Sequence, residues 1–255
     1  YYIKPDFSHF SLMTVVSAMG QLFYSMSLAM GIMITFGSYM KKEISIEKSV
    51  KQIEIFDTGV AFLAGLMIIP AVFAFSGGDE SALGKGPGLM FITLPKVFMN
   101  MPLGGLWGAL FFLFMVFACF STLTAVAECL IAALMDSFGW SRKKSCLFWG
   151  VFLLIMGLPS VFGFNIWKDI TLIRGMNIMF SEDFLVSNLL LPLGSLIFVL
   201  FCVSRYGWGW KKFTEEANTG KGLKVARWMR PIVTIVVPII IVTILVFGII
   251  NFNFK

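Results

Sequence analysis

Six long stretches of the chain contain no Asp, Glu, Lys or Arg, and they limit the possible folds more than any other feature. They are 7–40, 58–78, 97–127, 145–167, 184–204 and 231–254. Each is at least as long as the roughly 20 apolar residues that cross a bilayer as a helix. They are continuously apolar rather than alternating, and a lone segment in lipid must satisfy its own backbone, so helices are predicted rather than barrel strands. A soluble domain would also carry about twice the 13% of charged residues found here.

We therefore expect an all-α integral membrane protein, with 1–255 forming one membrane domain of six spans. The predicted spans are about 9–40, 56–77, 103–136, 145–163, 184–204 and 231–251. The connection 78–101 is rich in Gly and Pro but continues into an apolar segment, and we expect it to fold back as an extracellular lid.

Basic residues are concentrated in alternate loops. Four lie in 41–51, three in 142–144 and seven in 205–230, which makes 14 of the 20 in the chain. The positive-inside rule places these loops, called the basic loops below, on the cytoplasmic side. The net charge of +6 is thus a membrane-side anchor, and we expect no nucleic-acid partner. Both termini would lie outside, and the chain starts at Tyr1 without a signal-like segment, so we expect it to be the C-terminal part of a longer transporter.

The first span is too long for a simple crossing, and its middle, residues 24–31, is rich in hydroxyl and small side chains. Two interpretations remain open from the residues alone. Small residues let helices pack closely, whereas a broken helix would use its freed backbone groups to bind a ligand at mid-membrane.

Few residues could carry out chemistry. Three acids, Asp57, Glu128 and Asp136, lie in or beside apolar stretches, where a carboxylate must face protein, water or a cation. The four cysteines and the single His9 have no metal-type spacing. No nucleophile–base pair or phosphate-binding loop is present, so we expect no enzyme.

Three segments resemble one known family. Residues 20–31 running on to Ser38 and Tyr39 are similar to the sixth transmembrane helix of the neurotransmitter:sodium symporters. Residues 118–122 with 141–143 resemble the eighth helix and the following loop, and residues 91–95 resemble the fourth extracellular loop. The resemblance implies helices six to eleven of an eleven-helix, prokaryotic-type member: the second inverted repeat of a LeuT-type fold plus one further helix, with a broken first helix.

The resemblance also implies a set of site residues. One sodium site would use Ala118, Ser121 and Thr122, whose hard oxygen ligands suit a hard cation, and a second would use Ser25 and Asp57. The substrate pocket would be formed by Tyr24, Ser27, Met30, Gly31 and Val126. Gln21, Ser25 and Asp57 match the positions around the chloride of animal members. The gates would be Asp183 on the outer side and Asp136, Ser38 and Tyr39 on the inner side.

Three departures from the family pattern refine these expectations. Ala29 replaces a usual Gly, and Met30 replaces a common aromatic residue whose place a flexible thioether fills adaptably, which favours a hydrophobic or aromatic amino acid as substrate. Asp57 replaces a frequent Asn, so its own charge would make chloride unnecessary.

The resemblance implies sodium-coupled amino-acid symport by alternating access, with Na⁺, the amino acid and membrane lipid as partners, in a multi-pass protein of a bacterial inner membrane. The sequence does not indicate an oligomeric state. The alternative is a receptor or scaffold that keeps the fold without transporting. The hydroxyls retained at Ser25, Ser121 and Thr122 argue against it.

Overall fold

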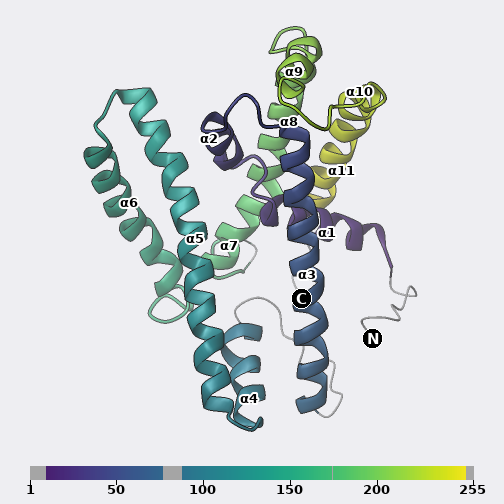
Figure 1. Ribbon diagram of the computed structural model, residues 1–255. Coiled ribbons are helices and arrows are strands. Elements are labelled where there is room, and N and C mark those ends of the chain that lie inside the picture. Colours follow the sequence, from purple (N-terminus) through teal and green to yellow (C-terminus); the bar gives the residue numbers. More distant parts are fainter. Residues whose placement is uncertain (1–9, 77–87, 174, 251–255) are drawn as a thin grey trace. The chain divides into compact units, whose positions relative to one another are not determined.

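All named secondary-structure elements in the described part of the chain are helices (Figure 1). The described residues are 10–76, 88–173 and 175–250 of a computed structural model. Five of them are long and apolar enough to cross a membrane: Ile46–Ala74, Gly104–Phe138, Arg142–Phe162, Ile178–Val203 and Met229–Ile250. The first predicted span is not among them, because it is divided into α1 (Leu12–Ser25) and α2 (Ile32–Ser38). The chain is thus an all-helical, multi-pass membrane protein with a broken first helix.

The chain forms two compact units, each described here by itself. In the first, residues 55–125, the core is built from Val72, Leu94 and Val97. These residues come from α3 (Ile46–Ser76) and α4 (Leu94–Met99), and Phe111 of α5 (Gly104–Phe138) packs against them. Of the predicted lid 78–101, residues 78–87 lie outside the described residues, and the rest includes the π-helical turn η3 (Leu89–Thr93) and α4.

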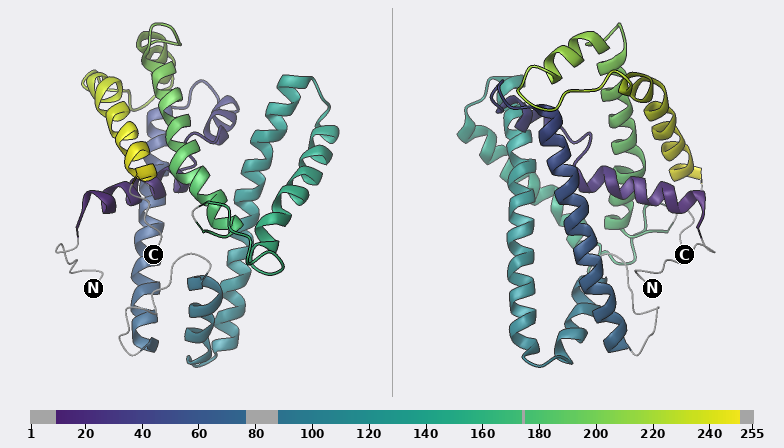
Figure 2. Two further views of the ribbon diagram at one scale, coloured as in Figure 1. Left: turned by 180° about the vertical axis from the view of Figure 1, so that it is seen from behind. Right: turned by 45° about the vertical axis from the view of Figure 1, so that its right-hand side comes forward.

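The second unit contains residues 10–54 and 126–250. Its helices are α1, α2, α6 (Arg142–Phe162), α7 (Ile178–Phe184), η4 (Leu185–Leu190), α8 (Leu191–Val203), α9 (Trp210–Ala217), α10 (Met229–Pro231), η5 (Ile232–Val236) and α11 (Val237–Ile250), with the ends of α3 and α5. The helices α8 and α11 pack side by side (Figure 2). Val16 and Phe23 of α1 bury against this pair, at Leu191, Ile241 and Ile244.

Proline explains the three π-helical turns. Each turn ends two residues before a proline: η3 before Pro95, η4 before Pro192 and η5 before Pro238. A proline inside a helix lacks the N–H of an i→i−4 bond, and its ring clashes with the preceding turn. Local widening to π geometry accommodates this clash without ending the helix. The segments Ile178–Val203 and Met229–Ile250 therefore continue through Pro192 and Pro238 as crossing helices.

Two basic loops are tied together at Ser45, which precedes α3. The Ser45 hydroxyl donates to the carbonyl of Leu223 at 2.7 Å and accepts the amide of Lys48 at 3.3 Å, as a helix-capping residue does. Beside it, Lys221 N–H donates to the Glu43 carbonyl at 3.0 Å. Because of this cap, α3 begins at Ile46, well before the predicted span boundary near 56. We call this set of contacts the Ser45 clamp.

Candidate functional site

The break between α1 and α2 is the most unusual stretch of backbone in the second unit. Three residues in it have left-handed backbone conformations: Ser27 (φ 52°), Ala29 (φ 62°) and Gly31 (φ 80°). Helical hydrogen bonding ends where the amide of Leu28 donates to the Phe23 carbonyl at 2.9 Å, and resumes at the Gly31 carbonyl. The predicted interruption near 27–31 is confirmed, and a new helix N-terminus at Ile32 leaves its first N–H groups without helical partners.

Close packing on both sides of the break holds it in place. On one side, Ala29 lies so near α8 that a Cβ added to Gly194 would be 3.1 Å from the Ala29 Cβ. On the other side, the Cys129 thiol lies 3.6 Å from the carbonyl of Met30, and a Cβ added to Gly31 would be 3.0 Å from that sulfur. Gly194, Gly31 and a small thiol thus permit the close approach that the bent backbone requires.

The residues that the resemblance places in the substrate pocket lie around this break. Tyr24 is on the last turn of α1 and is exposed, whereas Ser27, Met30 and Gly31 are half-buried within the break. Val126 is half-buried and lies three residues before Cys129, so both share the α5 face that contacts the break.

In the first unit, three of the predicted sodium ligands share one turn of α5. The hydroxyls of Ser121 and Thr122 both donate to the carbonyl of Ala118, at 2.8 and 3.1 Å. All three residues are exposed in the described chain. A hydroxyl that donates its proton in this way still presents lone pairs to a cation. That these groups face the break stays a prediction, because the two units are described separately.

The remaining sodium and chloride positions are divided between the units. Gln21 and Ser25 are exposed on α1 in the second unit, and Asp57 is half-buried on α3 in the first. Their combination into one site stays a prediction.

Near the basic loops, one carboxylate connects three helical segments. Glu128 of α5 accepts two hydrogen bonds from the Arg142 guanidinium, at 3.1 and 2.5 Å, and one from the Tyr39 hydroxyl at 2.9 Å. Arg142 begins α6, and Tyr39 ends α2. A bidentate arginine–carboxylate pair fixes geometry as well as charge. We call these three residues the Glu128 triad.

Sequence reasoning assigned Tyr39 to a gate but treated Glu128 and Arg142 separately. Nothing in their spacing brings them together. The signal was an acid inside a span with a basic residue just beyond the same span's end.

The other predicted gate residues have local partners or lie at the surface. Asp183 accepts a hydrogen bond from the Ser187 hydroxyl at 3.1 Å, one turn further along the same helical segment. Ser38 donates to the Thr35 carbonyl at 2.7 Å, and Asp136 is exposed near the end of α5. Their gate roles stay predictions.

Comparison with known proteins gives one consistent match. The model of the sodium:neurotransmitter symporter family matches residues 1–255. An uncharacterized sodium-dependent transporter of Haemophilus influenzae is 33% identical over 251 residues, which cover 96% of this chain and 52% of that protein. A sodium-dependent transporter of Methanocaldococcus jannaschii is 29% identical over 250 residues, covering 96% and 48%.

Among solved structures, that of MhsT in complex with L-phenylalanine matches with a TM-score of 0.82 and 33% identity, and covers 96% of this chain and 54% of that one. The chain therefore spans about half the length of the relatives that it matches.

Proposed function

The chain belongs to the sodium:neurotransmitter symporter family, a family of transporters rather than enzymes, and from this premise we propose that it supplies half of a sodium-coupled amino-acid symporter. The observation that carries the proposal is the break between α1 and α2. In transporters, interrupted helices bind substrate and ions near the middle of the membrane, because their free backbone groups find no hydrogen-bond partner in lipid.

Sodium binding is proposed at Ala118, Ser121 and Thr122. Their oxygens lie within one helical turn, and oxygen ligands suit hard cations. Three ligands are fewer than such an ion takes, so other residues of the full-length protein must complete the site. The two hydroxyls would turn their lone pairs toward the ion. The Ala118 carbonyl would give up part of its hydrogen bonding with these hydroxyls in order to coordinate the ion as well. Ser25 and Asp57 are proposed for a second site.

The substrate is proposed to be a hydrophobic or aromatic amino acid. Met30 lies half-buried in the break, and its unbranched thioether can adapt to a bulky side chain. The related MhsT was solved with L-phenylalanine bound, which supports the same class of substrate here. The N-terminus of α2 after Gly31 would favour the carboxylate of the amino acid by its helix dipole.

Coupling would come from ordering of the break. An ion that fixes α1 and α2 lowers the entropic cost of binding the amino acid next, so each ligand strengthens the other. On the side of the basic loops, the Glu128 triad connects the end of α2 to α5 and α6. We propose that these contacts close that side, together with Ser38 and Asp136, while Asp183 acts at the opposite gate.

Asp57 is proposed to make chloride unnecessary. Its ionised carboxylate would supply the fixed negative charge that a bound chloride supplies in a chloride-dependent relative. A human relative, the sodium- and chloride-dependent creatine transporter 1, is 28% identical over 142 residues, which cover 53% of this chain.

The proposal is tested with the full-length protein in liposomes. We expect uptake of labelled phenylalanine or leucine only with an inward sodium gradient. Thr122→Val removes one hydroxyl while keeping the side-chain volume, and should reduce sodium affinity. Thr124→Val is the matched control, because the Thr124 hydroxyl also donates to a carbonyl of its own helix, that of Phe120 at 2.7 Å.

Uptake that is independent of sodium would contradict the coupling, and equal effects of the two valine variants would contradict the ligand assignment. Binding of an amino acid without any uptake would favour the receptor or scaffold alternative.

A further inference from the structure

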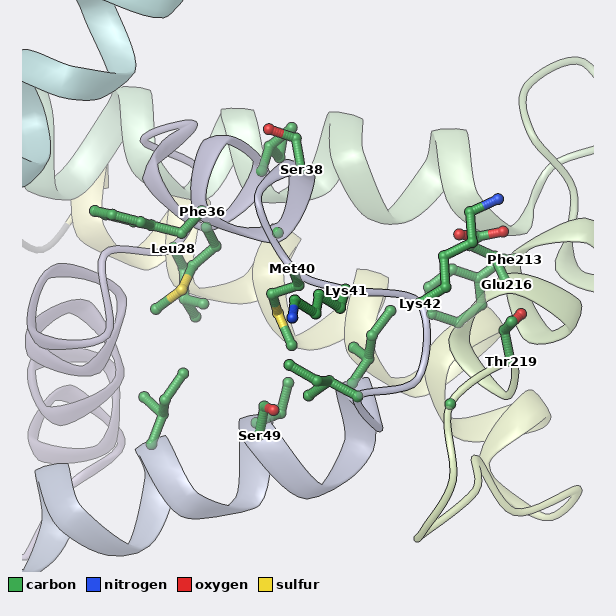
Figure 3. A pocket seen from close by; sticks show the side chains of 18 of the residues that line it. Leu28, Phe36, Ser38, Met40, Lys41, Lys42, Ser49, Phe213, Glu216 and Thr219 are labelled. Carbon is green, nitrogen blue, oxygen red and sulfur yellow. The ribbon is translucent and has the colours of Figure 1, made fainter.

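An apolar pocket of about 690 Å³ lies within the second unit, alongside α2 (Figure 3). Its walls come from α2, the loop 38–44, the first turns of α3, and the segment from Trp208 to Gly220. Met26 and Leu28, in the break itself, line one part of the pocket. The pocket therefore extends from the broken backbone to the basic loops. We call it the α2 pocket.

Only three charged side chains line the α2 pocket among the residues described: Lys41, Lys42 and Glu216. Figure 3 shows Lys41 beside Met40, whereas Lys42 extends toward the other end of the pocket, where Glu216 lies near Phe213 and Thr219. Both lysines are exposed, and neither forms an ion pair with another described residue. The pocket thus combines apolar walls with an excess of positive charge on the side of α2 and its loop.

The size of the pocket restricts what can occupy it. Its volume of about 690 Å³ is within the range of sites that enclose a small molecule or chain, about 300–1,000 Å³.

We propose that the α2 pocket binds one acyl chain of an anionic membrane phospholipid, whose phosphate pairs with Lys41. An apolar chain matches the Ile, Met and Phe side chains of the walls, because its burial removes apolar surface from water. A phosphate matches Lys41, whereas Glu216, toward which Lys42 extends, disfavours an anionic headgroup at the opposite end. The inference does not depend on the identity of the transported substrate.

The basic loops favour a phospholipid as the source of this chain. The segment that lines the pocket beyond α8 begins at Trp208, and an indole ring of this kind is typical of the membrane–water interface. Clusters of Lys and Arg next to a membrane attract anionic lipids, and 14 of the 20 basic residues lie in the basic loops. Bound lipid would contact α2 along its length and Leu28 beside the left-handed Ala29, so it would influence the order of the break.

The test uses full-length protein in phosphatidylcholine vesicles that contain a small fraction of phosphatidylglycerol with a photoreactive diazirine near the end of one acyl chain. After illumination, peptide mass spectrometry locates the label. We expect labelling of the peptides that carry 33–40 or 46–53. We expect about five-fold less with Lys41→Gln, and about five-fold less with a photoreactive phosphatidylcholine of the same chain.

Two variants sharpen the result. Lys48→Gln removes the same charge from the same loop region but from outside the pocket walls, and should leave labelling unchanged. Gly37→Leu should abolish labelling by filling the pocket, since a Cβ added to Gly37 meets no atom within 4 Å and the helix can accept it. Thermal unfolding of each variant checks that it is folded.

Three results would overturn the proposal. Absence of label from the pocket peptides would mean that other parts of the full-length protein fill it. Equal labelling by the two lipids would exclude recognition by lysine. A Lys48→Gln loss as large as that of Lys41→Gln would reduce the effect to diffuse surface attraction.

Discussion

Because Ala29 has a left-handed backbone conformation, we expect its substitution by glycine to stabilise the protein, whereas glycine in a regular helix destabilises it. Ala29 has φ 62°, where the Cβ of an L-residue costs roughly 1–2 kcal/mol. Glycine removes that cost, but its greater freedom in the unfolded chain takes back about 0.4–1 kcal/mol. Loss of a partly buried methyl takes back a few tenths more. We therefore expect Ala29→Gly to stabilise the full-length protein by about 0.5 kcal/mol.

An alanine in a regular helix provides the matched control. Ala133 is exposed on α5, and Ala133→Gly should destabilise by about 1 kcal/mol, the usual cost of glycine in a helix. The unfolded-state entropy of glycine is common to both variants and cancels in the comparison. The difference of about 1.5 kcal/mol corresponds to about 3 °C in melting temperature.

The assay is thermal unfolding of the purified full-length protein, followed by intrinsic tryptophan fluorescence. Ala29→Gly should melt above the wild type and Ala133→Gly below it. If both variants lower the melting temperature equally, residue 29 has ordinary helical geometry, and the assignment of the break would be refuted.

Three further predictions follow from other contacts. Gly31→Ala should destabilise through both its φ of 80° and the Cys129 sulfur 3.0 Å from the new Cβ; a second change, Cys129→Ala, should restore only part of the lost melting temperature, and full restoration would contradict the backbone argument. Glu128→Gln and Arg142→Gln each break the same paired hydrogen bonds, so the double variant should melt close to either single one, and additive losses would show that the two side chains act independently. In liposomes, Asp57→Asn should lose chloride-free uptake and regain activity when chloride is added, whereas wild-type uptake that stops without chloride would defeat this role.

The residues together with the family resemblance were sufficient to predict the broken first helix. A charge-free stretch too long for one crossing, with hydroxyl and small residues at its centre, carried the expectation, and the structure has α1 and α2 there. The backbone conformations could not be predicted in the same way. Ser27 and Ala29 adopt left-handed conformations that their residue types disfavour. At Ala29 this conformation accompanies close packing against Gly194 of α8, which the sequence does not reveal.

The polar contacts near the basic loops show the same limit. Glu128 and Arg142 are recognisable as charges at a membrane boundary, but their pairing depends on how α6 folds back after α5. Ser45 is an unremarkable serine in the sequence, and its bond to Leu223 joins residues 178 positions apart. Hydropathy locates the membrane-spanning segments, whereas the start of α3 at Ile46 and such long-range contacts depend on capping and tertiary packing.

The Ser45 clamp holds the short helix α2 between two short connecting segments. At one end α2 is joined to α1 by residues 26–31, and at the other end the six residues 39–44 connect Ser38 to the clamped Ser45. Even fully extended, the second connecting segment spans only about 24 Å between the Cα atoms of Ser38 and Ser45. α2 can therefore tilt between its two connections, but it cannot move far from either. A displacement of α2 is transmitted through the Ser45 clamp to the loop that leads into α10 and α11. Movement of α2 is in this sense mechanically coupled to the last crossing segment, Met229–Ile250.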